Sequence, residues 1–241
     1  MRLILDLLYA VFGVIFSLPM HLYFKSLAKK DLKKSWIKSN KYVRGFFKGL
    51  LFLSGTKVEV RGLENVPQDT ACLFVGNHRS YFDIIALHST VNRPLGFISK
   101  IEFSKTPLLP LYMLDMGCIF IDRDNAREGL KTINQGIEYM KQGLSLCLFP
   151  EGTRNHSDEL LPFKEGGYRM ADKSKSPIVI TAMSGMDDIF EKNKFYFVKK
   201  RHVIIEFDKP VYPSELKGDD KKQFYASIPE RIQELRSNHV L

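Results

Sequence analysis

The stretch ACLFVGNHRSYFD, residues 71–83, is the part of the chain from which its fold can be worked out. Its apolar beginning, Ala71–Val75, is typical of a buried strand that closes on Gly76. The apolar run Ile84–Leu87 predicts the first face of a helix, which Ser80 can cap. The stretch therefore predicts a strand, a polar turn and a helix in direct succession.

The predicted turn carries a histidine, His78, and the start of the predicted helix carries an aspartate, Asp83. Positions five apart on one continuous helix do not share a face. If His78 lies in the turn and Asp83 in the first helical turn, however, the chain can fold back and bring the carboxylate to the imidazole. That is the arrangement of a general base with its orienting partner. The alternative is a capping box between Ser80 and Asp83, in which the carboxylate only satisfies backbone N–H groups.

Residues 57–61 alternate between polar and apolar, similar apolar runs recur along the rest of the chain, and helical patterns lie between most of these segments. The predicted strands are 57–61, 71–75, 94–98, 118–121, 144–149, 178–182 and 203–207. The predicted helices are 82–89, 107–115, 125–142, 166–173 and 214–237. This alternation predicts an α/β domain over residues 55–241, with a central, largely buried sheet of about seven strands flanked by helices.

Residues 1–54 have a different pattern, which predicts a two-helix membrane-binding motif. Leu3–Met20 is almost entirely apolar and reaches the threshold length of a spanning helix, whereas Tyr42–Leu53 is amphipathic. Between Lys25 and Lys48 nine basic residues accompany one acid, Asp31, so this segment supplies 9 − 1 = +8 of the net charge of +9. We expect the helices to be immersed in one leaflet and to hold the protein at the cytoplasmic face of the inner membrane. The alternative is a helical hairpin packed on the core.

The remaining composition argues against other functional classes. Outside the basic segment the chain is almost neutral, which argues against a nucleic-acid-binding domain. Cys72, Cys118 and Cys147 each lie in an apolar run without CxxC spacing, so we expect free buried thiols in a reducing compartment. The histidines form no HxxxH or HExxH pattern, so we expect no metal.

Open α/β sheets carry their sites in loops at the carboxyl ends of strands, and two further loops stand out. Residues 119–123 deliver an arginine from a strand end, and residues 148–155 run from a buried strand into FPEGTRN. In the second loop, Gly152 allows close approach of a ligand and its N–H can point into the site. Arg154 offers a planar fork suited to phosphate, and Glu151 can orient that arginine or bind a hydroxyl. Each loop taken alone is also compatible with a surface turn that carries a solvated charge.

Together the motifs resemble those of the glycerolipid acyltransferases, and within them the bacterial 1-acyl-sn-glycerol-3-phosphate acyltransferases. The resemblance covers residues 55–210 and rests on four motifs in this order: NHxxxxD at 77–83, GxIFIDR at 117–123, FPEGTR at 149–154 and PIV at 177–179. Residues 99–103 and 162–166 are similar to two shorter family segments. Arg79 and Ile180 depart from the family pattern, and these departures concern the acyl pocket and the donor preference rather than the reaction.

The resemblance implies transfer of a fatty acyl group from a thioester to the sn-2 hydroxyl of lysophosphatidic acid, giving phosphatidic acid. His78 would be the general base, because imidazoles titrate near neutrality, and Asp83 would hold its tautomer. The substrate phosphate would bind Arg154 and Arg123, with Lys100 as a third anchor. The family's partners are membrane phospholipids and the lysophosphatidic acid acceptor.

The resemblance also assigns substrate-orienting roles to Glu151, Gly152 and Thr153. The donor would be acyl-CoA or acyl carrier protein, used as a co-substrate, with no tightly bound cofactor and no metal. Because the chain has no Gly-x-Ser-x-Gly elbow, we expect direct transfer without an acyl-enzyme. The alternatives are an acyltransferase for another lysophospholipid, a non-catalytic peripheral membrane adaptor, and a thioester hydrolase.

Overall fold

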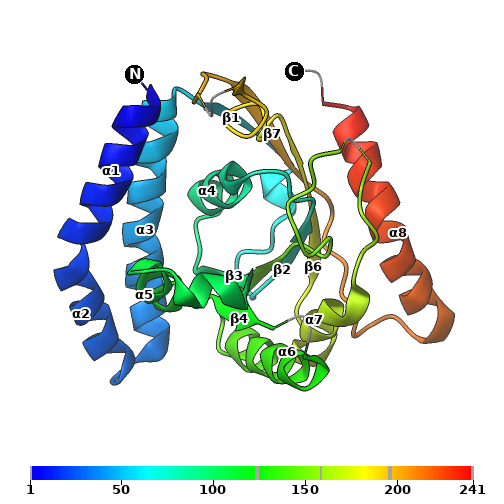
Figure 1. Cartoon of the computed structure of the whole chain (residues 1–241). Coiled ribbons are helices and arrows are strands. Elements are labelled where there is room, and N and C mark those ends of the chain that lie inside the picture. Colours follow the sequence, from blue (N-terminus) through cyan, green and yellow to red (C-terminus); the bar gives the residue numbers. More distant parts are fainter. Residues whose placement is uncertain (1, 123–124, 158, 195–196, 240–241) are drawn as a thin grey trace.

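The computed structural model describes residues 2–122, 125–157, 159–194 and 197–239. It confirms the predicted α/β class, because seven strands form one central sheet flanked by helices (Figure 1). The strands are β1 Lys57–Arg61, β2 Leu73–Gly76, β3 Leu95–Lys100, β4 Ile119–Ile121, β5 Ser145–Leu148, β6 Ile178–Ser184 and β7 His202–Phe207. Their order is β1-β7-β6-β2-β5-β3-β4, and neighbouring strands run parallel except for the antiparallel pair β6 and β7.

The predicted helices of the α/β part are also present, with bounds shifted by a few residues. They are α4 Tyr81–Thr90, α5 Leu109–Asp115, α6 Ala126–Lys141, α7 Arg169–Ser174 and α8 Gly218–Ser237. The region predicted as one helix over 166–173 instead begins with a 3-10 turn, η3 Glu165–Tyr168, and continues as α7. Two other 3-10 turns are η1 Leu63–Asn65 and η2 Ile101–Lys105.

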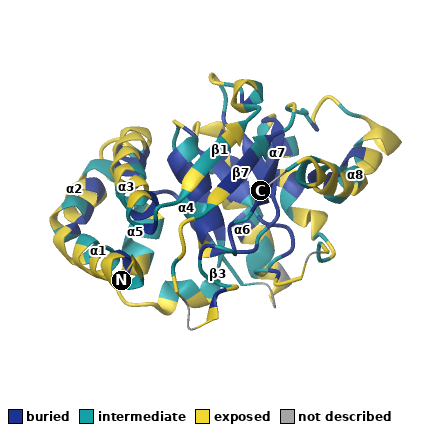
Figure 2. Ribbon diagram, turned by 90° about the horizontal axis from the view of Figure 1, so that it is seen from above, coloured by how far each residue is buried: buried dark blue, intermediate teal, exposed yellow. Residues whose placement is uncertain are grey.

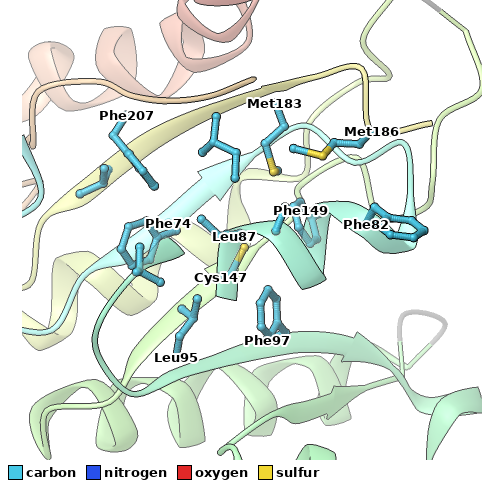
Figure 3. Close-up of a cluster of buried hydrophobic side chains, with 14 of the residues drawn as sticks. Phe74, Phe82, Leu87, Leu95, Phe97, Cys147, Phe149, Met183, Met186 and Phe207 are labelled. Carbon is cyan, nitrogen blue, oxygen red and sulfur yellow. The ribbon is translucent and has the colours of Figure 1, made fainter. Parts of the chain in front are cut away.

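The sheet is covered on both faces, which explains why its central strands β2 and β6 are buried along their whole length. Successive side chains of a strand point to opposite faces. On one face Phe74 and Cys147 pack with Leu87 of α4 (Figure 3). On the other face Leu73 packs in a second cluster with Ile228 of α8. The residues of both clusters are fully or almost fully removed from solvent, so each face of the sheet carries its own buried core.

The N-terminal region contains three helices instead of the predicted two: α1 Arg2–Phe16, α2 Leu18–Ala28 and α3 Leu32–Ser54. The expected single helix over Leu3–Met20 is bent by 49° where α1 meets α2. The break follows from Pro19 in the first turn of α2, because proline lacks an N–H and its ring clashes with the carbonyl four residues earlier. Ser17 at the break donates its hydroxyl to Val14 O over 3.0 Å.

These three helices differ in what they bury. α3 packs on the α/β core through Trp36, Val43 and Leu51, which are all buried. α1 and α2 lie outside α3 and are largely exposed (Figures 1 and 2), and their large apolar residues form a broad exposed surface. That surface, here called the α1–α2 apolar face, consists of exposed Ile4, Leu5, Leu7, Leu8, Val11, Phe12, Ile15, Phe16, Leu22 and Tyr23.

The described part of the chain has no single helix with the length and apolarity needed to cross a membrane. By length and composition, the bent pair of α1 and α2 together meets that requirement.

Candidate active site

Two loops that follow neighbouring parallel strands start side by side at one edge of the sheet. β2 lies between β6 and β5. Val75 of β2 lies opposite Leu148 of β5, so the two strands end at the same level. The loops that begin at Asn77 and Phe149 therefore share the edge where open α/β sheets carry their sites. Asn77 also ties this edge to β6, because its side chain exchanges two hydrogen bonds of 2.9 Å with the backbone of Met183.

The structure brings His78 and Asp83 into contact, and it also contains the capping box. Oδ2 of the fully buried Asp83 accepts hydrogen bonds from His78 Nδ1 over 2.9 Å and from the backbone N–H groups of Arg79 and Ser80 over 2.7 Å each. Ser80 Oγ accepts from Phe82 N over 2.9 Å. The predicted contact and the capping box are therefore both present, because the helix cap fixes the carboxylate that faces the imidazole.

This geometry determines which nitrogen of the neutral His78 imidazole carries the lone pair. Because Oδ2 of Asp83 already accepts two backbone N–H groups, it is an acceptor, and His78 Nδ1 must donate its proton to it. The neutral imidazole then carries its lone pair on Nε2. The ring of His78 also stacks on Phe149, with centroids 4.2 Å apart and planes at 11°. Two independent contacts thus fix the ring, whose side chain stays 14% exposed.

Glu151 and Gly152 differ from their expected geometry. Glu151 is buried, and it accepts from His78 N over 2.9 Å through Oε1 and from Asn155 Nδ2 over 2.8 Å through Oε2. It therefore braces the two loops against each other, and the carboxylate beside Arg154 is supplied by another residue. Gly152 adopts φ +78°, which favours glycine, but its N–H donates to Phe149 O over 3.0 Å in a turn and is not directed at a ligand.

Arg154 is held by two groups that the sequence analysis did not identify. Its Nη1 donates to Glu191 Oε1 over 3.3 Å, and its guanidinium lies over the ring of Tyr81, 3.9 Å from the centroid. Glu191 follows β6 and is distant in sequence, so no local pattern could have indicated the contact. The Arg154 side chain remains 30% exposed.

His78 and Arg154 line the same cavity of about 140 Å³, together with Lys100 from the end of β3 and exposed Thr153. The complete lining is His78, Tyr81, Ile84, Phe97, Ile98, Ser99, Lys100, Phe103, Phe149, Gly152, Thr153 and Arg154. We call this space the His78 cavity. Of the predicted site residues, Arg123 lies outside the described residues.

Two more cavities adjoin the His78 cavity at Gly152. One of about 160 Å³ lies between the ends of β4 and β5, α6 and the η3–α7 region, and Ile133 and Met170 line it. It is mainly apolar and is called the α6 cavity here. The other, of about 290 Å³, is more polar and is lined by Lys100, Thr153 and Lys164. Three cavities therefore meet at Gly152: the His78 cavity with its charged side chains, the apolar α6 cavity and the polar cavity.

The cysteines are buried and free, as predicted. Burial raises the pKa of the Cys72 thiol to about 11 and that of Cys118 to about 12. Burial, and then the charge of Asp83, raise the pKa of Cys147 well above its usual value. These thiols stay protonated near neutral pH, so none supplies a thiolate nucleophile. Among the described residues, no group of three or more His, Cys, Asp or Glu side chains is arranged to hold a metal ion.

Comparison with known proteins places these features in context. The family model described as Acyltransferase matches residues 57–184. A chloroplastic 1-acyl-sn-glycerol-3-phosphate acyltransferase, BAT2, from Brassica napus is 33% identical over 160 residues, which cover 66% of this chain and 46% of that relative. A probable 1-acyl-sn-glycerol-3-phosphate acyltransferase from Mycoplasma pneumoniae is 31% identical over 195 residues, covering 76% of this chain and 73% of the relative.

A solved structure is also similar over the whole chain. It is the crystal structure of the 1-acyl-sn-glycerophosphate (LPA) acyltransferase, PlsC, from Thermotoga maritima. The two chains are 25% identical in sequence and superpose with a TM-score of 0.77, each covered completely.

Proposed function

This chain belongs to the acyltransferase family whose model matches its residues 57–184, and we propose that it acylates the sn-2 hydroxyl of 1-acyl-sn-glycerol 3-phosphate with an acyl thioester, giving phosphatidic acid. The names of the bacterial and plant relatives support this reaction. The observation that carries the proposal is that His78, with its lone pair on Nε2, lines the same cavity as Arg154. One acceptor molecule in this cavity then meets both a base for its hydroxyl, His78, and an anchor for its phosphate, Arg154.

The chemistry requires no acyl-enzyme. His78 Nε2 takes the proton of the sn-2 hydroxyl as the oxygen attacks the thioester carbonyl, and Asp83 stabilises the imidazolium that forms. The tetrahedral oxyanion collapses with cleavage of the C–S bond, and the departing thiolate takes the proton from the imidazolium. The protonated, buried cysteines support this direct route, since none of them is a ready nucleophile.

The acceptor phosphate would bind Arg154 and Lys100, with Arg123 as a further anchor. A phosphate monoester carries close to two negative charges near neutral pH, and the planar fork of Arg154 suits its oxygens. The oxyanion needs preorganised donors, and Gly152 N–H is already engaged. We therefore assign the oxyanion contact to Thr153, which is exposed and lines the His78 cavity.

The adjoining cavities accommodate the other parts of the substrates. The α6 cavity is mainly apolar and suits a fatty acyl chain. The polar cavity beside Lys100 and Lys164 suits the amide-containing arm that coenzyme A and acyl carrier protein share. Because the two carriers present the same arm to this cavity, we propose that the donor is an acyl-CoA or an acyl carrier protein thioester, and no tightly bound cofactor is needed.

We further propose that the N-terminal region anchors the enzyme in one leaflet at the cytoplasmic face of the inner membrane. The α1–α2 apolar face supports this location, because its exposed residues are spread over both helices (Figure 2). The basic segment Lys25–Lys48 adds attraction to anionic lipid. Since α3 packs on the core, the lipid-facing part would be α1 and α2, with residues 55–241 as the acyltransferase domain.

A panel of acceptors tests the reaction. Purified full-length protein in mixed micelles receives one long-chain thioester, supplied as acyl-CoA or as acyl carrier protein, and lysophospholipids that share one acyl chain but differ in headgroup. We expect acylation of lysophosphatidate to dominate, with little free fatty acid. A preference for an acceptor without a phosphate monoester would reassign the substrate. Release of fatty acid alone would indicate a hydrolase, and no turnover with any donor would favour the membrane adaptor.

A further inference from the structure

The segment between β6 and β7 supplies a carboxylate, Glu191, that connects the acceptor side of the site with the histidine side. Its side chain is only 6% exposed. Oε1 accepts from Arg154 Nη1 over 3.3 Å and from Tyr81 N over 3.0 Å, and Oε2 accepts from the Ser80 hydroxyl over 2.7 Å. One carboxylate therefore links the guanidinium to the first residues of α4, the helix that carries Asp83.

A second ion pair attaches the same segment to the same turn. Asp187 Oδ2 accepts from Arg79 Nε over 2.8 Å and lies 2.7 Å from Arg79 Nη2, and both side chains are buried. Arg79 directly follows His78 in the chain. The segment therefore contacts the turn at two places, at Arg79 through Asp187 and at Ser80 and Tyr81 through Glu191.

These contacts leave Arg154 few orientations. One face of its guanidinium is covered by Tyr81, and Nη1 is engaged by Glu191. Among the described residues, Nε and Nη2 of Arg154 make no hydrogen bond, so they are the donors that a ligand in the His78 cavity can use. Glu191 also benefits from its position, since a helix N-terminus favours a negative charge.

We propose that Glu191 is the positioning residue for Arg154, and that it fixes the anchor of a phosphate-bearing acceptor relative to the His78–Asp83 pair. The inference rests on the proposed function. Without Glu191 the arginine keeps its charge but loses its orientation. Binding of the acceptor would weaken, whereas proton transfer at His78 would continue. A role as a helix cap alone would have a different signature, because disturbing α4 displaces Asp83 and lowers kcat.

A double-mutant cycle with Glu191→Gln and Arg154→Ala separates these roles. Kinetics with lysophosphatidate are measured for the parent, both single variants and the double variant of the full-length protein. We expect Glu191→Gln to raise the acceptor KM about tenfold, the loss typical of a charge-assisted hydrogen bond, with kcat and the donor KM near the parent values. In the Arg154→Ala background the same change should have no further effect. The control is Asp188→Asn, which removes an exposed carboxylate from the same segment and should behave like the parent.

Two results would overturn the inference: a full Glu191→Gln effect that persists without Arg154, or a loss confined to kcat. If the parent itself does not acylate lysophosphatidate, it is the proposed function that fails. The positioning role is then decided by the Nε–H resonance of Arg154 in nuclear magnetic resonance spectra. A sharp parent signal that broadens or averages in Glu191→Gln supports positioning, and an unchanged signal refutes it.

Discussion

Replacing Asp83 with asparagine changes the charge beside His78 with little change in shape. Oδ2 accepts three hydrogen bonds, from His78 Nδ1 and from the N–H groups of Arg79 and Ser80. The asparagine oxygen must keep this position, because an amide NH₂ there would face three donors. The imidazole tautomer is then retained, and the NH₂ occupies the place of Oδ1, which is buried and has no hydrogen-bond partner among the residues that the structure describes. The substitution therefore removes the negative charge and adds an unsatisfied donor.

The expected loss of activity follows from the electrostatics of the imidazolium. Two unit charges about 4 Å apart interact by roughly 4 kcal/mol at an effective dielectric constant of about 20. Each 1.36 kcal/mol corresponds to a factor of about ten in rate, so kcat should fall about 10³-fold. The acceptor KM should stay near its parent value, because the charge acts on the transition state. The unsatisfied amide should also lower the unfolding free energy by about 1–3 kcal/mol.

The assay is the initial rate of phosphatidate formation at saturating substrates, with folding checked by thermal unfolding. The chain offers a matched control in a second His–Asp pair remote from the site. His21 Nδ1 lies 2.8 Å from Asp115 Oδ2, and the two side chains are 10% and 9% exposed, so this pair is nearly as buried as His78 and Asp83. Asp115→Asn should lower stability but leave kcat unchanged. A less than tenfold loss of kcat in Asp83→Asn would refute the catalytic role and leave Asp83 as a helix cap.

Three further predictions concern other parts of the molecule. Burial, and then the charge of Arg44, lower the pKa of His88 from 6.5 to about 3. At a pH between these two pKa values, the His88 imidazole binds a proton in the unfolded state but not in the folded state. The unfolding free energy should therefore fall with pH below 6.5, and His88→Gln should reduce the loss between pH 7 and 5 by about 2 kcal/mol in denaturant titrations. The double variant Leu7→Glu, Phe12→Glu places two negative charges on the α1–α2 apolar face. It should no longer sediment with anionic vesicles, whereas its acyl-transfer kinetics in detergent micelles should equal those of the parent. Gly129 lines the α6 cavity and a Cβ added there would meet nothing within 4 Å, so Gly129→Phe should narrow this cavity and shift donor preference toward shorter acyl chains in competition assays.

Much of the fold could be predicted because its signals are local. Most strands are short apolar runs and the first is an alternating pattern, and the predicted strands 57–61 and 203–207 agree with β1 and β7 to within one residue. The contact of His78 with Asp83 was also predictable, because both residues belong to one turn capped by Ser80. The break in the first helix was not predicted, although Pro19 is the residue responsible for it.

The charged partners within the site could not be predicted from the sequence. Arg154 and Glu191 lie 37 residues apart, and Arg79 and Asp187 lie 108 apart, so no helical or strand period relates them. Their contacts depend on how the segment after β6 returns over α4. Glu151 shows the converse case, because its place beside Arg154 in the chain indicated a partnership. In the folded loop its carboxylate instead accepts from His78 N and Asn155.

In the proposed reaction His78 acts as the base that deprotonates the acceptor hydroxyl. The most direct test of this role is the initial rate at which purified His78→Ala protein converts lysophosphatidate and a long-chain thioester to phosphatidate, measured by mass spectrometry beside the parent. We expect a loss of about 10³-fold, within the range of general-base catalysis, with vesicle binding and thermal stability retained. A folded, membrane-bound His78→Ala protein that keeps a rate within tenfold of the parent would show that His78 is not the base.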